Sequence, residues 1–171
     1  MTRGARQRCV DLPAGPWLDW ADQKLLAGGG CVTLDAPLGK LPLLLRADQL
    51  VPMLDPSIET LSEESDPTIV GPTDVADVYD VVGLVAAHAR FGASFAVTRA
   101  GAFAAPAGFT EAADEAALAA CARCFRTDAG AGFTRLRLST TGTDDVVAGG
   151  ITLTQKARPR TRWDLFLPTA L

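Results

Sequence analysis

The stretch DAPLGKLPLLLRADQLVPMLDP, residues 35–56, contains a nearly unbroken apolar run that decides how this chain is built. Pro42 interrupts the run, and Arg46 closes it. Because proline cannot donate to a sheet ladder, Pro42 places the run at a sheet edge or at the start of a strand. Three successive leucines put apolar side chains on both faces, which is typical of a strand covered from both sides. We therefore expect a short buried strand over residues 41–45, with Pro42 marking its start.

The rest of the chain is rich in turn-forming residues. Its 171 residues include 11 prolines and 16 glycines, a composition that favours short strands over long helices. The segment Thr110–Cys124 differs, because it is alanine-rich, has acidic residues in its first turns and has Thr110 as a candidate cap. We predict a mainly β protein with one or two β-sandwich units, Ig-like or jelly-roll-like, and one short α-helix near residues 111–124.

The segment 56–74 divides the chain. It is polar, contains several prolines and shows no period, which is typical of either a linker or a long loop that covers another element. On this interpretation residues 1–55 form a proximal β-sandwich segment. Residues 75–171 then form a distal β-sandwich that carries the helix.

The charge balance and hydropathy exclude some classes of partner. Sixteen basic against twenty acidic residues give a net charge of -4, which argues against a nucleic-acid partner. No apolar stretch approaches the roughly 18 residues that a membrane helix needs, so no membrane partner is expected. The basic N-terminus lacks the apolar core of a secretory signal, so the chain as written is expected in the cytoplasm. A fragment of an exported enzyme would have a different location.

Six short elements between residues 10 and 53 carry a resemblance to a known family. In order, they are Leu12-Pro13-Ala14-Gly15, Trp17-Leu18-Asp19-Trp20, Gly28-Gly29-Gly30, Ala36-Pro37-Leu38, Leu41-Pro42-Leu43-Leu44-Leu45-Arg46-Ala47 and Leu50-Val51-Pro52. This segment resembles the region directly after the catalytic barrel in family 31 glycoside hydrolases, the α-glucosidase and α-xylosidase group. The resemblance covers about a quarter of the chain. It extends to residues 75–171 by position only.

The resemblance implies a protein that is not an enzyme on its own. Retaining glycosidases use two carboxylates about 5 Å apart. In family 31 both are barrel aspartates, and 171 residues cannot hold a barrel of about 250. The chain would be a non-catalytic accessory domain that braces the catalytic barrel of a family 31 glycosidase, in cis or in trans, without a cofactor. Such a piece should expose an apolar patch near residues 35–54 or 17–20.

Three residues are expected at the seam with that barrel. They are Arg46, which would be a structural charge there, Trp17 and Asp48. The family usually has glycine where this chain has Asp48, which suggests a turn with positive φ. Aspartate tolerates that conformation better than most residues do.

Two other functions stay open from the sequence. A free-standing carbohydrate-binding module would stack Trp17, Trp20 or Trp163 on the sugar rings of an α-glucan, although packing in a core or a seam is the commoner role of a strand tryptophan. A scaffold domain without a ligand is the third interpretation.

The remaining reactive residues suggest little chemistry. Cys121 and Cys124 form a C-x-x-C pair, but a zinc site needs two more ligands. Paired thiols are expected there, or a local disulfide in an exported parent, and Cys9 can pair with Cys31 across strands.

The other polar candidates are expected to be structural. The single histidine, His88, has no Gly-x-Ser-x-Gly partner motif for a catalytic triad. The acidic triplet in 74–80 lacks the glycine of a calcium loop and is expected to be solvated. Its members are Asp74, Asp77 and Asp80. A basic run between 156 and 162 is expected to be an exposed hairpin turn. It consists of Lys156, Arg158, Arg160 and Arg162.

Overall fold

A computed structural model describes residues 4, 6–62, 65–75, 78–142, 145–156 and 160–169. Within these residues the protein is mainly β with one short helix, which confirms the predicted fold class. The strands are β1 Gln7–Leu12, β2 Pro16–Asp19, β3 Lys24–Ala27, β4 Gly30–Asp35, β5 Leu44–Arg46, β6 Gln49–Met53, β7 Val78–Leu84, β8 His88–Phe91, β9 Phe95–Phe103, β10 Thr110–Glu111, β11 Cys124–Gly130, β12 Phe133–Thr141, β13 Val146–Gln155 and β14 Arg160–Pro168; the helix is α1, Glu115–Ala120. In the part of the chain described, no helix is long and apolar enough to cross a membrane.

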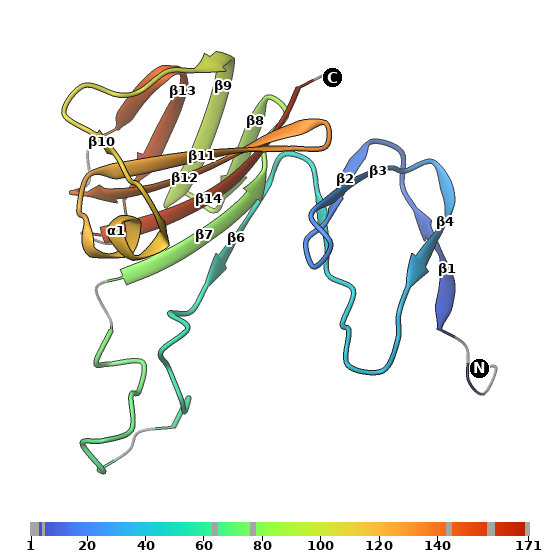
Figure 1. Cartoon of the computed structure of the whole chain (residues 1–171), viewed down its shortest axis with the longest axis horizontal. Coiled ribbons are helices and arrows are strands. Elements are labelled where there is room, and N and C mark those ends of the chain that lie inside the picture. The colour runs from blue at the N-terminus through green and yellow to red at the C-terminus, as the bar shows by residue number, and fades with distance from the viewer. Residues whose placement is uncertain are drawn as a thin grey trace.

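A small N-terminal lobe precedes the main body of the protein (Figure 1). In this lobe β1 pairs with β4, and the order β3-β2-β5 forms a second small antiparallel sheet. The remaining strands form one nine-stranded sheet in the order β10-β11-β12-β14-β7-β6-β8-β9-β13. Two of its internal pairs, β14–β7 and β6–β8, are parallel, so the chain must cross over the sheet to form them.

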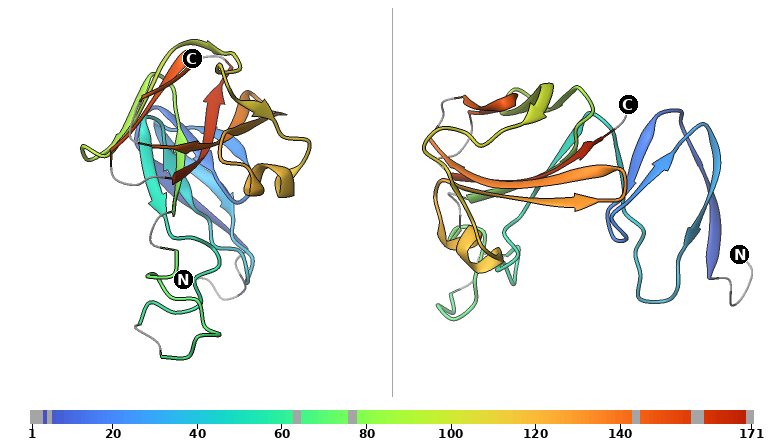
Figure 2. Two further views of the ribbon diagram at one scale, coloured as in Figure 1. Left: turned by 90° about the vertical axis from the view of Figure 1, so that its left-hand side faces the viewer. Right: turned by 45° about the horizontal axis from the view of Figure 1, so that its top comes forward.

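The large sheet curls so that its two ends form two layers. In Figures 1 and 2, β9 and β13 lie over β11, β12 and β14. The space between the layers is filled by the main core, in which Val97 and Ile151 from one layer join Leu136, Leu138 and Trp163 from the other. The alternation of apolar residues along β12 and β14 produces this one-sided burial.

A second core joins the lobe to the outer face of the sheet. Leu18 and Leu45 of the lobe pack with Leu84, Phe133 and Phe166 of the sheet. The same face of β7, β12 and β14 is therefore covered by the lobe at one end only. Beyond that end its side chains are charged, and they form the site described below.

The apolar run around Pro42 differs from its prediction. The strand begins only at Leu44, and it is an edge strand that pairs with β2 alone. Leu41 is 73% exposed and Leu43 is 43% exposed, whereas Leu45 is buried. The expectation of a strand covered from both sides was wrong, because Pro42 keeps the preceding residues out of the ladder and nothing in the lobe covers them.

The predicted division of the chain at residue 56 does not coincide with the boundary between the lobe and the large sheet. β6 belongs to the segment 1–55, yet it pairs with β7 inside the large sheet, where Leu50 lies opposite Gly83. A Cβ at residue 83 would come within 2.5 Å of the Leu50 side chain, so glycine permits this close pairing. Of the two alternatives for residues 56–74, a linker or a long loop, the structure has the long loop, because this segment joins two adjacent strands of one sheet. The described part of the loop extends away from the sheet (Figure 1).

The helix is shorter than expected and has a different cap. Asp114 is the N-cap, and its carboxylate accepts from Ala117 N at 2.8 Å. Thr110, the predicted cap, lies in β10 because its N–H donates to the carbonyl oxygen of Arg123 and holds this segment in a parallel bridge with β11.

Asp48 adopts the positive φ that the sequence comparison suggested, with φ of 61°. The turn gives its side chain a role that the sequence did not indicate. Asp48 Oδ1 accepts from the backbone N–H groups of Ala86 and Ala87 at 2.9 Å each and of His88 at 3.2 Å. One carboxylate therefore fixes both the entry into β6 and the turn between β7 and β8.

We predict that the Asp48 carboxylate, and not the backbone conformation alone, stabilises this junction. Asp48→Gly keeps the positive φ but leaves three N–H groups without their acceptor, so it should lower the free energy of unfolding by about 2 kcal/mol. Asp48→Asn keeps Oδ1 as an acceptor and should cost less than about 1 kcal/mol. Urea denaturation compares the two variants, and equal stabilities would contradict this role.

The two-stranded sheet β1–β4 depends on a covalent link. Most of its residues are exposed, and only Leu12 and Leu34 are buried. A two-stranded ribbon of this kind is marginal in water. A disulfide joins Cys9 to Cys31 and holds the two strands together.

We predict that removal of this disulfide opens the ribbon locally. Cross-links of this separation stabilise by about 3 kcal/mol in the chain-entropy account. In the Cys9→Ser, Cys31→Ser double variant, amide hydrogen exchange should accelerate in β1 and β4 and stay unchanged in β12 and β14. The Cys121→Ser, Cys124→Ser variant is the matched control and should leave β1 and β4 protected. Unchanged protection of β1 and β4 in the first variant would show that the strands hold without the disulfide.

Candidate functional site

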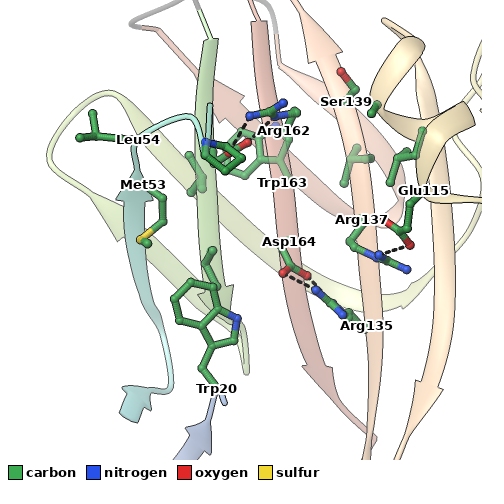
Figure 3. Close-up of a pocket in the computed structure, with 17 residues that line it drawn as sticks. Trp20, Met53, Leu54, Glu115, Arg135, Arg137, Ser139, Arg162, Trp163 and Asp164 are labelled. Atoms are coloured by element: carbon green, nitrogen blue, oxygen red, sulfur yellow. Dashed lines mark hydrogen bonds and ion pairs between the residues drawn. The ribbon is translucent and has the colours of Figure 1, made fainter. Parts of the chain in front are cut away.

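A groove of about 460 Å³ lies on the outer face of the large sheet, between the N-terminal lobe and α1. Figure 3 shows Trp20 at the end of the groove toward the lobe and Arg162 at the other end, with Asp164 and Arg135 between them. Met53 and Leu54 lie along the side formed by β6. The volume is within the range of about 300–1,000 Å³ that is typical of small-molecule sites.

The floor of the groove carries paired charges from neighbouring strands. Arg135 on β12 and Asp164 on β14 form a bidentate pair, with Nε–Oδ1 at 2.7 Å and Nη2–Oδ2 at 2.8 Å. Arg162 donates to both oxygens of Asp80 on β7, and its Nη2 also donates to Asp55 at 2.6 Å. Bidentate pairs of this kind fix the planes of both groups, so the floor has a defined geometry.

A third arginine links the floor to the helix. Arg137 donates to Glu115 of α1 and to Asp128 of β11. Its side chain is only 13% exposed. The Arg137–Glu115 pair holds α1 against the sheet. In turn, α1 supplies one wall of the groove through Leu118 and Ala119.

Two arginines of the floor have raised pKa values. The hydrogen bonds with Asp80 and Asp164 raise the pKa values of Arg162 and Arg135, respectively, against the opposing effect of burial. Burial acts to raise the pKa of Asp55, but hydrogen bonds from Ser57 and the charge of Arg162 outweigh it and lower that pKa. Arg135, Arg162 and Asp55 therefore keep their charges near neutral pH.

The lining carries equal numbers of arginines and acids, and most of its other residues are apolar. Three arginines, at 135, 137 and 162, stand against three acids, at 80, 115 and 164, while Asp55 and Asp128 bind Arg162 and Arg137 from outside the lining. Among the described residues no three side chains are placed to hold a metal ion. The site thus presents paired hydrogen-bonding groups, with no excess of positive charge, next to an indole ring.

The structure separates the three tryptophans that the sequence singled out. Trp20 is half-buried and lines the groove. Trp163 is 2% exposed, its Nε1 donates to Thr140 Oγ1 at 2.9 Å, and its ring meets Phe95 edge-on, so its candidacy as a sugar platform was wrong. Trp17 lies in the lobe, where its Nε1 donates to the carbonyl oxygen of Pro13 at 2.9 Å beside Gly28.

Several large apolar side chains are exposed within the segment where the apolar patch was predicted. Arg46 is exposed on the edge strand β5, opposite Trp17 in the register with β2. Five of the eight exposed large apolar side chains in the described part of the chain fall within residues 35–54. They are Leu38, Leu41, Leu43, Val51 and Leu54. We refer to residues 36–43, which carry the first three, as the leucine loop.

The leucine loop is held in place despite its exposure. Leu43 O accepts from Trp20 N at 2.9 Å, and Lys40 pairs with Asp22 and approaches Asp19 at 3.8 Å. The hydrogen bond with Asp22 raises the pKa of Lys40, so Lys40 stays charged. The loop therefore presents its leucines on a fixed frame.

The four cysteines form two disulfides, Cys9–Cys31 and Cys121–Cys124, so the weak zinc candidates Cys121 and Cys124 are not free ligands.

His88 contacts Thr98 through Nδ1 at 2.9 Å and is exposed. Two residues from the acidic and basic runs, at 77 and 158, lie outside the described residues.

The predictions for Asp80 and Arg162 were wrong. Asp80 was expected to be solvated and Arg162 to lie in an exposed turn, but both belong to the groove floor, because strand pairing brings β7 and β14 side by side. The sequence did contain a signal for this charged floor. Charged residues alternate with other residues in TRLR (134–137) and RWD (162–164), and residues two apart share a face of a strand.

Comparison with family models and with curated proteins finds no match. A solved structure does match: the 1.9 Å crystal structure of uncharacterized protein lmo2446 from Listeria monocytogenes EGD-e, with a TM-score of 0.53 and 15% identity. The match covers 90% of this chain and 17% of that chain. At this identity the likeness shows the fold alone. The same arrangement of strands therefore occurs as a small part of a much longer protein.

Proposed function

We propose that this chain is a non-catalytic accessory domain of a family 31 α-glycosidase and braces its catalytic barrel. The six elements of the resemblance support this, because they all fall in or next to the N-terminal lobe. They span β2, the turns that flank it, the leucine loop, β5 and β6. The resemblance is thus concentrated in one compact part of the protein and not scattered over it.

The exposed leucine loop is the observation that carries the proposal. Leu38 is fully exposed, and Leu41 is 73% exposed, on a loop that is fixed by hydrogen bonds and an ion pair. Burying a leucine side chain is worth about 1.5–3 kcal/mol. A fixed group of such side chains is typical of a surface that another domain covers. The barrel is the covering surface that the resemblance implies.

Two further observations support a place in a longer or assembled protein. The matching fold in lmo2446 makes up only 17% of that chain. The two disulfides of this chain persist in oxidising compartments, which supports an exported parent over a cytoplasmic one. The catalytic aspartates would belong to the barrel, so this chain would contribute stability and not chemistry.

The free-standing module with several tryptophan platforms has less support. Trp163 is in the core and Trp17 is locked against Pro13, which leaves Trp20 as the remaining candidate platform. A ligand-free scaffold would not need the leucine loop to be exposed. The accessory role accounts for the loop as well as for the resemblance.

We predict that the native product contains or binds a barrel. Immunoblotting and intact mass spectrometry of the product from the source cells should find a chain heavier than 17.9 kDa, or a 17.9 kDa chain that co-elutes with α-glycosidase activity. A triple variant of the leucine loop should lower the thermal stability of the glycosidase activity in that native assembly, because the covered surface becomes polar. Its substitutions are Leu38→Ser, Leu41→Ser and Leu43→Ser.

Leu61→Ser is the matched control, since Leu61 is 74% exposed but lies in the long loop of the other part of the protein. This variant should leave the stability of the activity unchanged. A 17.9 kDa monomer without associated glycosidase activity would contradict the proposal.

A further inference from the structure

The groove between Trp20 and Arg162 has features that bracing a barrel does not require. It lies on the face of β7, β14 and β12, whereas the leucine loop belongs to the lobe. The sheet face under the groove is covered by the lobe at one end and bordered by α1 at the other. Contact between the leucine loop and a barrel therefore does not account for the groove.

The charges of the groove select against anionic ligands. A site for phosphate or for an acidic sugar needs an excess of arginine or lysine. Here each of the three arginines of the lining is paired with an acid, and Asp55 and Asp128 add two acids from outside the lining. A neutral ligand can approach without breaking these pairs.

The paired groups retain unused hydrogen-bonding capacity. A guanidinium has five N–H donors, and a carboxylate has about four acceptor positions. Arg135 and Arg162 each use Nε and Nη2 on carboxylates, and no hydrogen bond among the described residues engages Nη1 of either. The pairs thus hold donors and acceptors side by side in fixed positions, which suits a ligand that carries hydroxyl groups on adjacent carbons.

Trp20 adds an aromatic surface at the end of this polar floor (Figure 3). Its backbone N–H donates to Leu43 O, and its side chain packs against the second core, so its position is fixed before any ligand arrives. An indole offers a broad apolar contact surface with little loss of side-chain freedom. Neutral sugars combine apolar ring faces with a rim of hydroxyl groups, and they match both parts of the groove.

We infer that the groove binds a neutral oligosaccharide, with Trp20 as the contact for one sugar ring and the Asp164–Arg135 and Asp80–Arg162 pairs as partners for its hydroxyl groups. This inference does not rest on the proposed function.

The test uses the whole chain and two neutral probes, maltotriose and cellotriose, measured by isothermal titration calorimetry. The wild-type protein should bind at least one of them saturably. Ala119→Trp should abolish this binding, because Ala119 lines the groove from α1 and a larger side chain fills it. Ala117→Trp is the matched control, since Ala117 is exposed on the same helix but does not line the groove.

A second pair of variants tests the aromatic contact. Trp20→Phe should weaken binding roughly ten-fold, whereas Trp17→Phe, outside the groove, should leave affinity unchanged. Thermal melts establish that each variant is folded. The anionic probe trigalacturonic acid should bind less tightly than the neutral sugars.

Three results would overturn the inference. Absence of binding for both neutral probes would remove the site. Binding that persists in Ala119→Trp would place any sugar contact elsewhere. Tighter binding of trigalacturonic acid than of the neutral probes would show that the paired charges do not set the ligand class.

Discussion

The carboxylate of Asp48 is the interaction on which the joining of the two parts of this protein depends. The chain leaves the lobe at Arg46, turns through a positive φ at Asp48 and enters the large sheet as β6. The side chain at that turn binds three backbone amides of the turn after β7. Because β6 and β7 are neighbours, this contact sets where the lobe meets the sheet. The apolar contact of Leu18 and Leu45 with Phe166 then lies directly beside the junction.

One face of β7, β12 and β14 has an apolar end and a charged end. Toward the lobe its side chains are apolar and buried, as at Leu84 and Phe166. Farther along the same strands they become Asp80, Arg162 and Asp164, which pair across the sheet or with neighbouring strands. The lobe covers the apolar end, and the charged end remains open as the groove. A single change of composition along three strands therefore creates both an interdomain core and a candidate binding surface.

The sequence predicted the class of fold and one backbone detail, and the reasons for its failures are physical. Gly and Pro content and the short apolar segments indicated a mainly β protein, because these signals are local. The positive φ at Asp48 was suggested by the resemblance, through the glycine that the family usually has at this position. The burial of Leu41 and Leu43 depended on whether another element covers them, which no local pattern reveals. Thr110 satisfied the rules for a cap, but a distant partner strand held it extended. The Asp80–Arg162 pair joins residues 82 positions apart, so only the parallel pairing of β7 with β14 brings it together.

The exposed leucine loop is the centre of the functional account, since it is fixed in place and yet uncovered. The most direct measurement is carbene footprinting of the leucine loop, read by mass spectrometry, in the isolated 171-residue chain and in the native product from the source cells. The account predicts strong labelling of Leu38, Leu41 and Leu43 in the isolated chain and protection of all three in the native product, with Leu61 labelled equally in both. Equal labelling of the leucine loop in the two samples would contradict it, because no other domain would then cover this surface.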